Sequence, residues 1–131
     1  MAYLDKAAIL AAADLLYEDV PVAEWGGTVR VRGLTGRERD AFEAAVASTK
    51  GKDVKLNLQN VRARLVALSV VDADGARIFD ERDIGALGEK SAQALERVFQ
   101  VAMRLSGLTP TDVKDLTENL DDGQSDDSIS A

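Results

Sequence analysis

The fold of this chain is decided by residues 25–40, WGGTVRVRGLTGRERD. The pair Gly26-Gly27 can take the positive φ angles that a two-residue hairpin turn needs. On both sides of this pair, valines alternate with polar residues or proline, which is the pattern of strands with one buried face. These valines are Val20, Val22, Val29 and Val31. The stretch therefore predicts an antiparallel β-hairpin.

The turn also sets the expected register of the hairpin. With Gly26-Gly27 as the turn, Trp25 faces Thr28 and Val22 faces Val31. The valines then share one face, and Trp25 lies on the opposite face with the two arginines of the second strand, Arg30 and Arg32. Because Pro21 cannot donate a hydrogen bond to a neighbouring strand, we expect the first strand to lie at the edge of its sheet.

The valine face of the hairpin requires a cover, since an isolated hairpin is only marginally stable in water. Thr35 and Glu38 have the spacing of a capping box, and they predict a helix that runs to about residue 49. Apolar residues at helical spacing predict two more long helices, over about 57–70 and 91–106. These three helices are expected to build the core with the hairpin.

Shorter helices are predicted where a polar residue can cap the first turn. The capping residues are Asp5, Asp80 and Thr109. Residues 72–75, Asp-Ala-Asp-Gly, predict a turn between two elements. The expected fold class is therefore α+β, with an N-terminal β-hairpin packed on a small bundle of about four to five helices.

Charge is distributed unevenly along the chain, whose net charge is −7. Residues 1–110 hold 16 acidic and 15 basic residues, whereas 111–131 hold seven acidic residues and one lysine. A basic run precedes and enters the second long helix; it consists of Lys50, Lys52, Lys55, Arg62 and Arg64. We expect one domain over residues 1–118 and a disordered acidic tail over 119–131.

The chain contains few of the groups that enzymes and metal sites use. Histidine and cysteine are both absent, so the commonest general base, the thiolate nucleophile and the usual zinc ligands are missing. Residues 72–75 lack the ligand spacing of a calcium-binding loop, and Gly26-Gly27 lacks the lysine of a phosphate-binding loop. We expect no enzyme activity, no cofactor and no metal.

Nucleic acids and membranes are also unexpected partners. The basic run lacks aromatic residues that could stack on bases, and the acidic net charge opposes the approach of phosphates. No stretch of about 20 apolar residues is present that could span a bilayer.

Two features of the sequence could contact a partner protein. Trp25 can be interpreted either as a core residue or as an exposed anchor for a partner, where tryptophan is enriched. The apolar stripe over residues 95–105 is interpreted as core, with a docking groove as the alternative. The residues expected to contact a partner are Trp25, Arg30, Arg32, Arg62, Arg64, Phe99 and Met103.

Four segments together resemble a known family. They are EWGGTVRVRGLTGRERDAF at 24–42, RLVALSVVDADG at 64–75, LGEKS at 87–91 and RLSGLT at 104–109. In order and spacing they resemble the tail assembly chaperones of long-tailed bacteriophages and prophages, in particular those of phages of actinobacteria and related Gram-positive hosts. The resemblance spans about residues 5–118.

This resemblance implies a small non-enzymatic α+β protein that works in the cytoplasm of the bacterial host. Such chaperones bind the tape measure protein, keep it soluble during tail tube assembly and leave before the virion is complete. The expected partners are therefore the tape measure protein, the major tail tube protein and a second copy of the chain. The alternative is a structural virion protein of the tail, such as a tube, completion or connector component.

Overall fold

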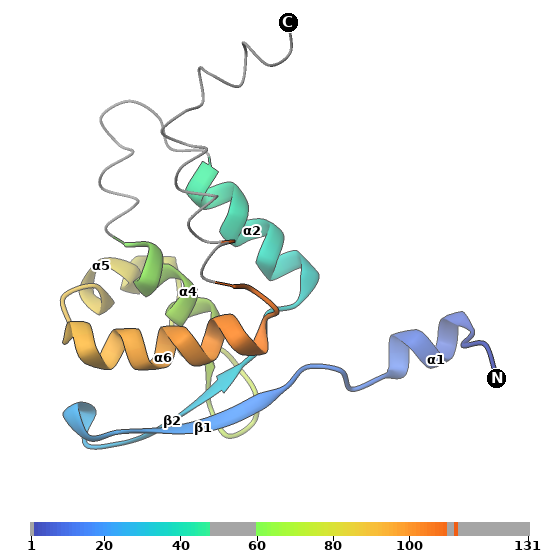
Figure 1. The fold of residues 1–131 in the computed structure, drawn as a ribbon, viewed down its shortest axis with the longest axis horizontal. Helices are drawn as coiled ribbons and strands as arrows, with labels where there is room; N and C mark the ends of the chain where they lie inside the picture. The colour runs from blue at the N-terminus through green and yellow to red at the C-terminus, as the bar shows by residue number, and fades with distance from the viewer. Residues whose placement is uncertain (1, 48–59, 110–111, 113–131) are drawn as a thin grey trace, which may run out of the picture.

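The computed structural model of the chain describes residues 2–47, 60–109 and 112. Within these residues a three-stranded antiparallel sheet lies against helices on one of its faces (Figure 1). The strands, in the order β1-β2-β3, are β1 (Tyr17–Val22), β2 (Gly27–Arg32) and β3 (Val70–Val71). The predicted α+β class is confirmed. The third strand was missed, because its two valines directly follow a helix and continue that helix's apolar pattern.

Helices make up most of the remaining described chain. They are α1 (Lys6–Ala11), α2 (Gly36–Ala47), α4 (Val61–Ser69), α5 (Ile84–Leu87) and α6 (Ala92–Leu105), with the 3₁₀ turns η1 (Ala23–Trp25) and η2 (Glu81–Asp83). The three predicted long helices correspond to α2, α4 and α6. Their expected extensions at 48–49 and 57–59, the lysines at 50–55 and the acidic tail all lie outside the described residues.

The hairpin register differs from the prediction. Val22 pairs with Gly27 and Val20 pairs with Val29, so the predicted pairing of Val22 with Val31 is wrong. The connection is a four-residue loop, in which η1 ends at Gly26 with a φ of 77°. Gly26 donates its N–H to the Ala23 carbonyl at 3.0 Å. Glu24 and Trp25 thus belong to the turn and not to a strand. The sequence did not indicate this, because Gly26-Gly27 also fits a two-residue turn.

This change of register leaves the same valines on the buried face of the sheet. The partner of Val22 shifts by four residues, and an even shift leaves each side chain on the same face of the sheet. Val20, Val22 and Val31 are accordingly buried beneath the helices. Trp25 is half-buried and packs against the same core, so its predicted place beside the arginines is wrong.

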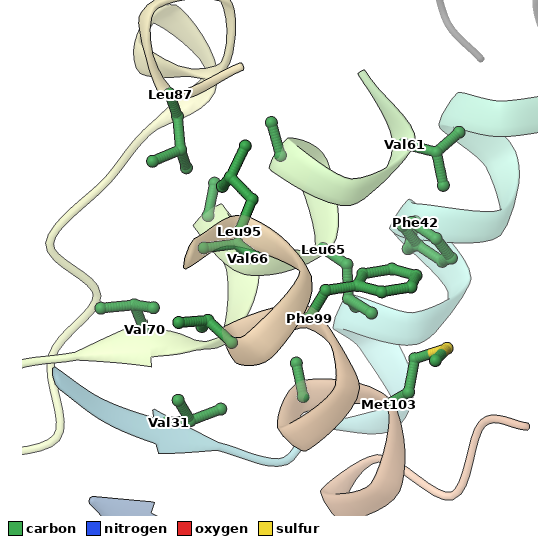
Figure 2. Close-up of a cluster of buried hydrophobic side chains, with 14 of the residues drawn as sticks. Val31, Phe42, Val61, Leu65, Val66, Val70, Leu87, Leu95, Phe99 and Met103 are labelled. Atoms are coloured by element: carbon green, nitrogen blue, oxygen red, sulfur yellow. The ribbon is translucent and has the colours of Figure 1, made fainter. Parts of the chain in front are cut away.

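The core lies between the sheet and the helices (Figure 2). Phe42 from α2, Leu65 from α4 and Phe99 from α6 meet at its centre, and Met103 lies beside them. The apolar stripe of α6 is therefore confirmed as core. α1 contributes nothing to this core, because none of its residues is buried and it stands apart from the body (Figure 1).

β1 lies at the edge of the sheet, as its proline predicted. The Leu16 carbonyl accepts a hydrogen bond from Gly33 N–H at 2.9 Å, so the backbone groups of Leu16 point toward β2. Backbone groups alternate in direction along an antiparallel strand, which makes those of Tyr17, Asp19 and Pro21 point outward. Pro21 has no N–H there, so another strand cannot pair regularly along this edge.

The predicted caps at Thr35, Asp5 and Asp80 and the predicted turn are confirmed, whereas the short helix predicted after Thr109 lies outside the described residues. Thr35 and Glu38 exchange hydrogen bonds of 3.1 and 3.0 Å between side chain and backbone. Asp5 caps α1, and Asp80 caps the short helical segment after it. Asp72 accepts two backbone N–H groups of its own turn. These acids therefore satisfy local backbone donors.

Gly33 generates a test of the contact between the sheet and α6. A Cβ added there would lie 2.5 Å from the Leu105 carbonyl oxygen, so Gly33→Ala should lower the free energy of unfolding by about 1–3 kcal/mol. Gly27→Ala is the matched control, because an added Cβ there meets no heavy atom within 4 Å. Urea denaturation checks both variants. Equal midpoints would show that α6 does not approach the sheet this closely.

Candidate functional site

Two adjoining depressions lie at the end of the molecule where the hairpin turns and α6 begins. The smaller, the hairpin-tip pocket, has a volume of about 240 Å³ and is lined by Trp25, Phe79, Asp83, Ala86, Leu87 and Lys90. The larger, the α4–α6 groove, has a volume of about 830 Å³; its polar lining consists of Arg62, Lys90, Gln93, Glu96, Arg97 and Gln100. Lys90 borders both depressions.

The hairpin-tip pocket has an apolar floor and a charged rim. Leu87 is buried in the core, and Trp25 and Phe79 pack partly against it. On the rim, Asp83 accepts a hydrogen bond from the Asp80 backbone, while Lys90 makes no ion pair with any residue that the structure describes. An apolar pocket with a polar rim is the usual setting of an anchor residue at a protein interface.

Trp25 is one of the apolar residues that line this pocket. Its indole nitrogen is buried and has no hydrogen-bond acceptor among the described residues. Buried indole N–H groups usually find a partner, and phenylalanine would fill a core without this cost. Trp25 therefore packs against the core at the cost of a buried indole N–H that makes no hydrogen bond to a described residue. Trp25 is half-buried and packs against the core, and its role as a partner anchor remains a proposal.

An ion pair ties the hairpin tip to α6. The Glu24 carboxylate accepts two hydrogen bonds from the Arg97 guanidinium, at 2.8 and 3.0 Å. These bonds, with a backbone hydrogen bond, lower the pKa of Glu24 from 4.5 to about 2. Because Glu24 precedes Trp25 in η1, the pair ties the turn that carries the tryptophan to α6.

Arg62 lies at the wall of the α4–α6 groove. Its side chain is 59% exposed, pairs with Glu96, and stacks with its guanidinium carbon 5.6 Å from the centre of the Phe99 ring. Glu96 also accepts a hydrogen bond from Gln100, and this bond and the arginine together lower its pKa. The groove therefore presents an ordered row of polar side chains above a buried ring.

The other residues expected at a partner interface lie elsewhere. Arg32 is bound to Glu38 at the start of α2, and Arg64, only 14% exposed, binds Glu81 at 2.9 Å. Arg30 lies on the outer face of the sheet, where it pairs with Asp19. Phe99 and Met103 are buried. Of the seven residues expected, the structure thus brings Trp25 and Arg62 to the adjoining depressions.

Sequence reasoning missed the most exposed apolar surface of the described chain. Residues 2–16, here called the N-terminal arm, carry several large apolar side chains, including Tyr3 at 93% and Leu10 at 78% exposure. The separation of the arm from the body could have been inferred from the sequence. The arm has too few large apolar residues at helical spacing to form a stripe that faces the core. The helix was predicted, but its separation from the body was not.

The described residues contain neither a metal-binding cluster nor a membrane-spanning helix. No group of three or more acidic residues lies close enough to hold a metal ion in this part of the chain. Likewise, none of the described helices has the length and apolar character needed to cross a membrane.

Comparison with known proteins identifies the class. Residues 4–119 match the family described as phage tail assembly chaperone. The fold is similar to that of the bacteriophage HK97 tail assembly chaperone, with a TM-score of 0.55 and 20% identity over 73% of this chain and 92% of that one. No match was found among curated proteins. The chain is thus a phage tail assembly protein. It belongs to the phage tail assembly chaperone family.

The Glu24–Arg97 pair predicts a defined pH dependence. Glu24 has a lower pKa in the folded chain than in the unfolded chain, so its contribution to stability is complete above pH 4.5 and is lost as the pH falls toward 2. Glu24→Gln should therefore be less stable than the natural chain at pH 6, and this difference should shrink below pH 4.5. Urea midpoints measured from pH 6 to pH 3 check this. A constant difference would mean that the carboxylate is not held by Arg97.

Proposed function

We propose that the chain is a non-enzymatic chaperone that binds the tape measure protein in the host cytoplasm and keeps it soluble during tail tube assembly. The family supports a role in tail assembly, and the hairpin-tip pocket is the observation that supports this particular role. An apolar pocket beside a polar groove suits a helix that presents large apolar side chains on one face.

The two depressions can contact different sides of such a helix. The floor of the hairpin-tip pocket can receive one large apolar side chain against Trp25 and Leu87. The α4–α6 groove then lies beside the polar flank of the helix, where Arg62, Lys90 and Gln93 can bond to it. The net charge of −7 would keep such a complex soluble.

Co-expression with a tape measure fragment tests this function. The natural chain should hold the fragment in the soluble fraction and co-purify with it. Ala86→Glu places a charge in the hairpin-tip pocket without disturbing a buried residue, and it should weaken binding about tenfold or more, equivalent to about 1.4 kcal/mol. Ala44→Glu, at an exposed position of α2, is the matched control and should bind normally.

Two results would contradict the proposal. An insoluble fragment that never co-purifies would exclude tape measure binding, and equal binding by both variants would exclude the pocket. Circular dichroism establishes that both variants are folded. Mass spectrometry of mature virions tests the chaperone role separately, because a chaperone is absent from the particle and a structural tail component is present.

A further inference from the structure

The α4–α6 groove carries cationic groups that the described part of the chain does not fully pair. Its lining holds three cations, Arg62, Lys90 and Arg97, and one acid, Glu96. Arg97 donates from both terminal nitrogens to Glu24. Arg62 donates only its Nε to Glu96, so its terminal nitrogens have no acceptor among the described residues. Lys90 is exposed and makes no ion pair within the same part of the chain. The groove therefore offers two cationic groups to a carboxylate.

Arg62 is held in place before any ligand arrives. Its Nε is bound to Glu96, and its guanidinium carbon lies 5.6 Å from the centre of the Phe99 ring. Glu96 is itself fixed by a hydrogen bond from Gln100. The terminal nitrogens of an arginine match the two oxygens of a carboxylate, and a group that is already ordered loses little entropy on binding. At about 830 Å³, the groove has the volume of a site for an extended segment of several residues.

The same chain contains a segment of complementary charge. The acidic tail, residues 119–131, holds four aspartates and neither lysine nor arginine. The aspartates form two adjacent pairs, Asp121-Asp122 and Asp126-Asp127, with three uncharged residues between them. Two acidic pairs can therefore meet the two cationic groups of the groove in one extended stretch.

The end of α6 directs the chain back over this helix. Gly107 has a φ of 74° and donates its N–H to the Arg104 carbonyl at 3.3 Å. Leu108 donates to the Met103 carbonyl at 2.9 Å, and its side chain is buried. The described chain after α6, drawn in orange, accordingly turns back above the helix instead of continuing its axis (Figure 1).

The length of the connecting segment lets the tail reach the groove of its own molecule. Gln100, the groove residue nearest the end of α6, lies less than two turns before Leu105. Thr109 and Asn119 are ten residues apart, a stretch that can span up to about 33 Å. The aspartates can therefore lie along the groove without any change in the body.

We propose that the acidic tail docks in the α4–α6 groove of the same chain, with its aspartates bound to Arg62 and Lys90. Single ion pairs between exposed groups are weak. The covalent connection, however, keeps the tail at a high local concentration beside the groove, so that several weak pairs suffice. This advantage favours the chain's own tail over an acidic segment of another molecule.

One consequence rests on the proposed function, since the polar flank of a tape measure helix would use the same groove. A docked tail competes with this client for Arg62 and Lys90, so the free chaperone holds its groove covered until a client displaces the tail. Tail docking is measured without any client, and the two proposals can therefore fail separately.

The experiment places a spin label on the tail of the full-length chain and records NMR spectra of its backbone amides. The chain has no cysteine, so Ser128→Cys supplies a single labelling site beside the aspartates. The amides of Gln93, Glu96 and Arg97 should lose most of their intensity at low salt. The intensity should return at about 1 M salt, where charges are screened within about 3 Å.

Two sets of variants of the labelled chain test the charges from both sides. Replacing the four aspartates by asparagine should restore the groove signals, and so should Arg62→Gln combined with Lys90→Gln. Arg37→Gln combined with Arg77→Gln is the matched control, because it removes two exposed cations that do not line the groove. This control should show the same loss of intensity as the natural charges. The spectra also establish that each variant is folded.

Three results would overturn the inference. The first is a groove whose signals keep their intensity when the tail is labelled. The second is a loss that persists without Arg62 and Lys90, which would place the tail elsewhere. The third comes from mixing a spin-labelled chain with an unlabelled chain enriched in ¹⁵N. A loss of groove signals of equal size in this mixture would show that the tail binds another copy.

Client binding separates this inference from the proposed function. If the tail covers the groove in about half or more of the molecules, the chain with four asparagines should bind the tape measure fragment about twofold or more tightly than the natural chain. Equal affinities would contradict the competition. A fragment that binds neither chain would contradict the proposed function, while the NMR result on tail docking would stand.

Discussion

The packing of α6 across the valine face of the sheet is the contact on which the rest of the structure depends. Val31 and Val98 are fully buried between these layers, and Gly33 allows the end of β2 to lie directly against the Leu105 carbonyl. The Leu34 N–H then donates to the Ser106 hydroxyl at 3.0 Å, so strand and helix end together. This contact sets the height of α6 above the sheet, and therefore the place of the helices that pack around it.

The hairpin-tip pocket lies where the packing of α6 on the sheet ends. Before the N-terminal end of α6, Trp25 of the hairpin loop lies with Phe79 and with Ala86 and Leu87 of α5 around the hairpin-tip pocket. Glu24 and Arg97 hold the loop there, which keeps Trp25 half-buried. The proposed function requires apolar surface that is accessible without unfolding, and a loop held by an ion pair beside this pocket would provide it.

Several elements were predictable because their causes are local. The capping box of Thr35 and Glu38, the turn at Asp72 and the edge position of β1 each depend on neighbours within a few residues. The hairpin register was not predictable in this way, because η1 competes with a two-residue turn for the same glycines. Likewise, Arg32 and Arg64 look like free cations in the sequence, and only folding brings their carboxylate partners to them.

The sequence by itself determined the α+β class, the family resemblance and the faces of the strands, because periodicity and capping are properties of adjacent residues. Tertiary structure alone decided which apolar side chains stay accessible. Phe99 and Met103 are buried because α2 and α4 close over them, while Ile9 and Leu10 remain exposed because the arm leaves the sheet beyond the last helix. Burial depends on what other elements cover, and that is decided only when the layers assemble.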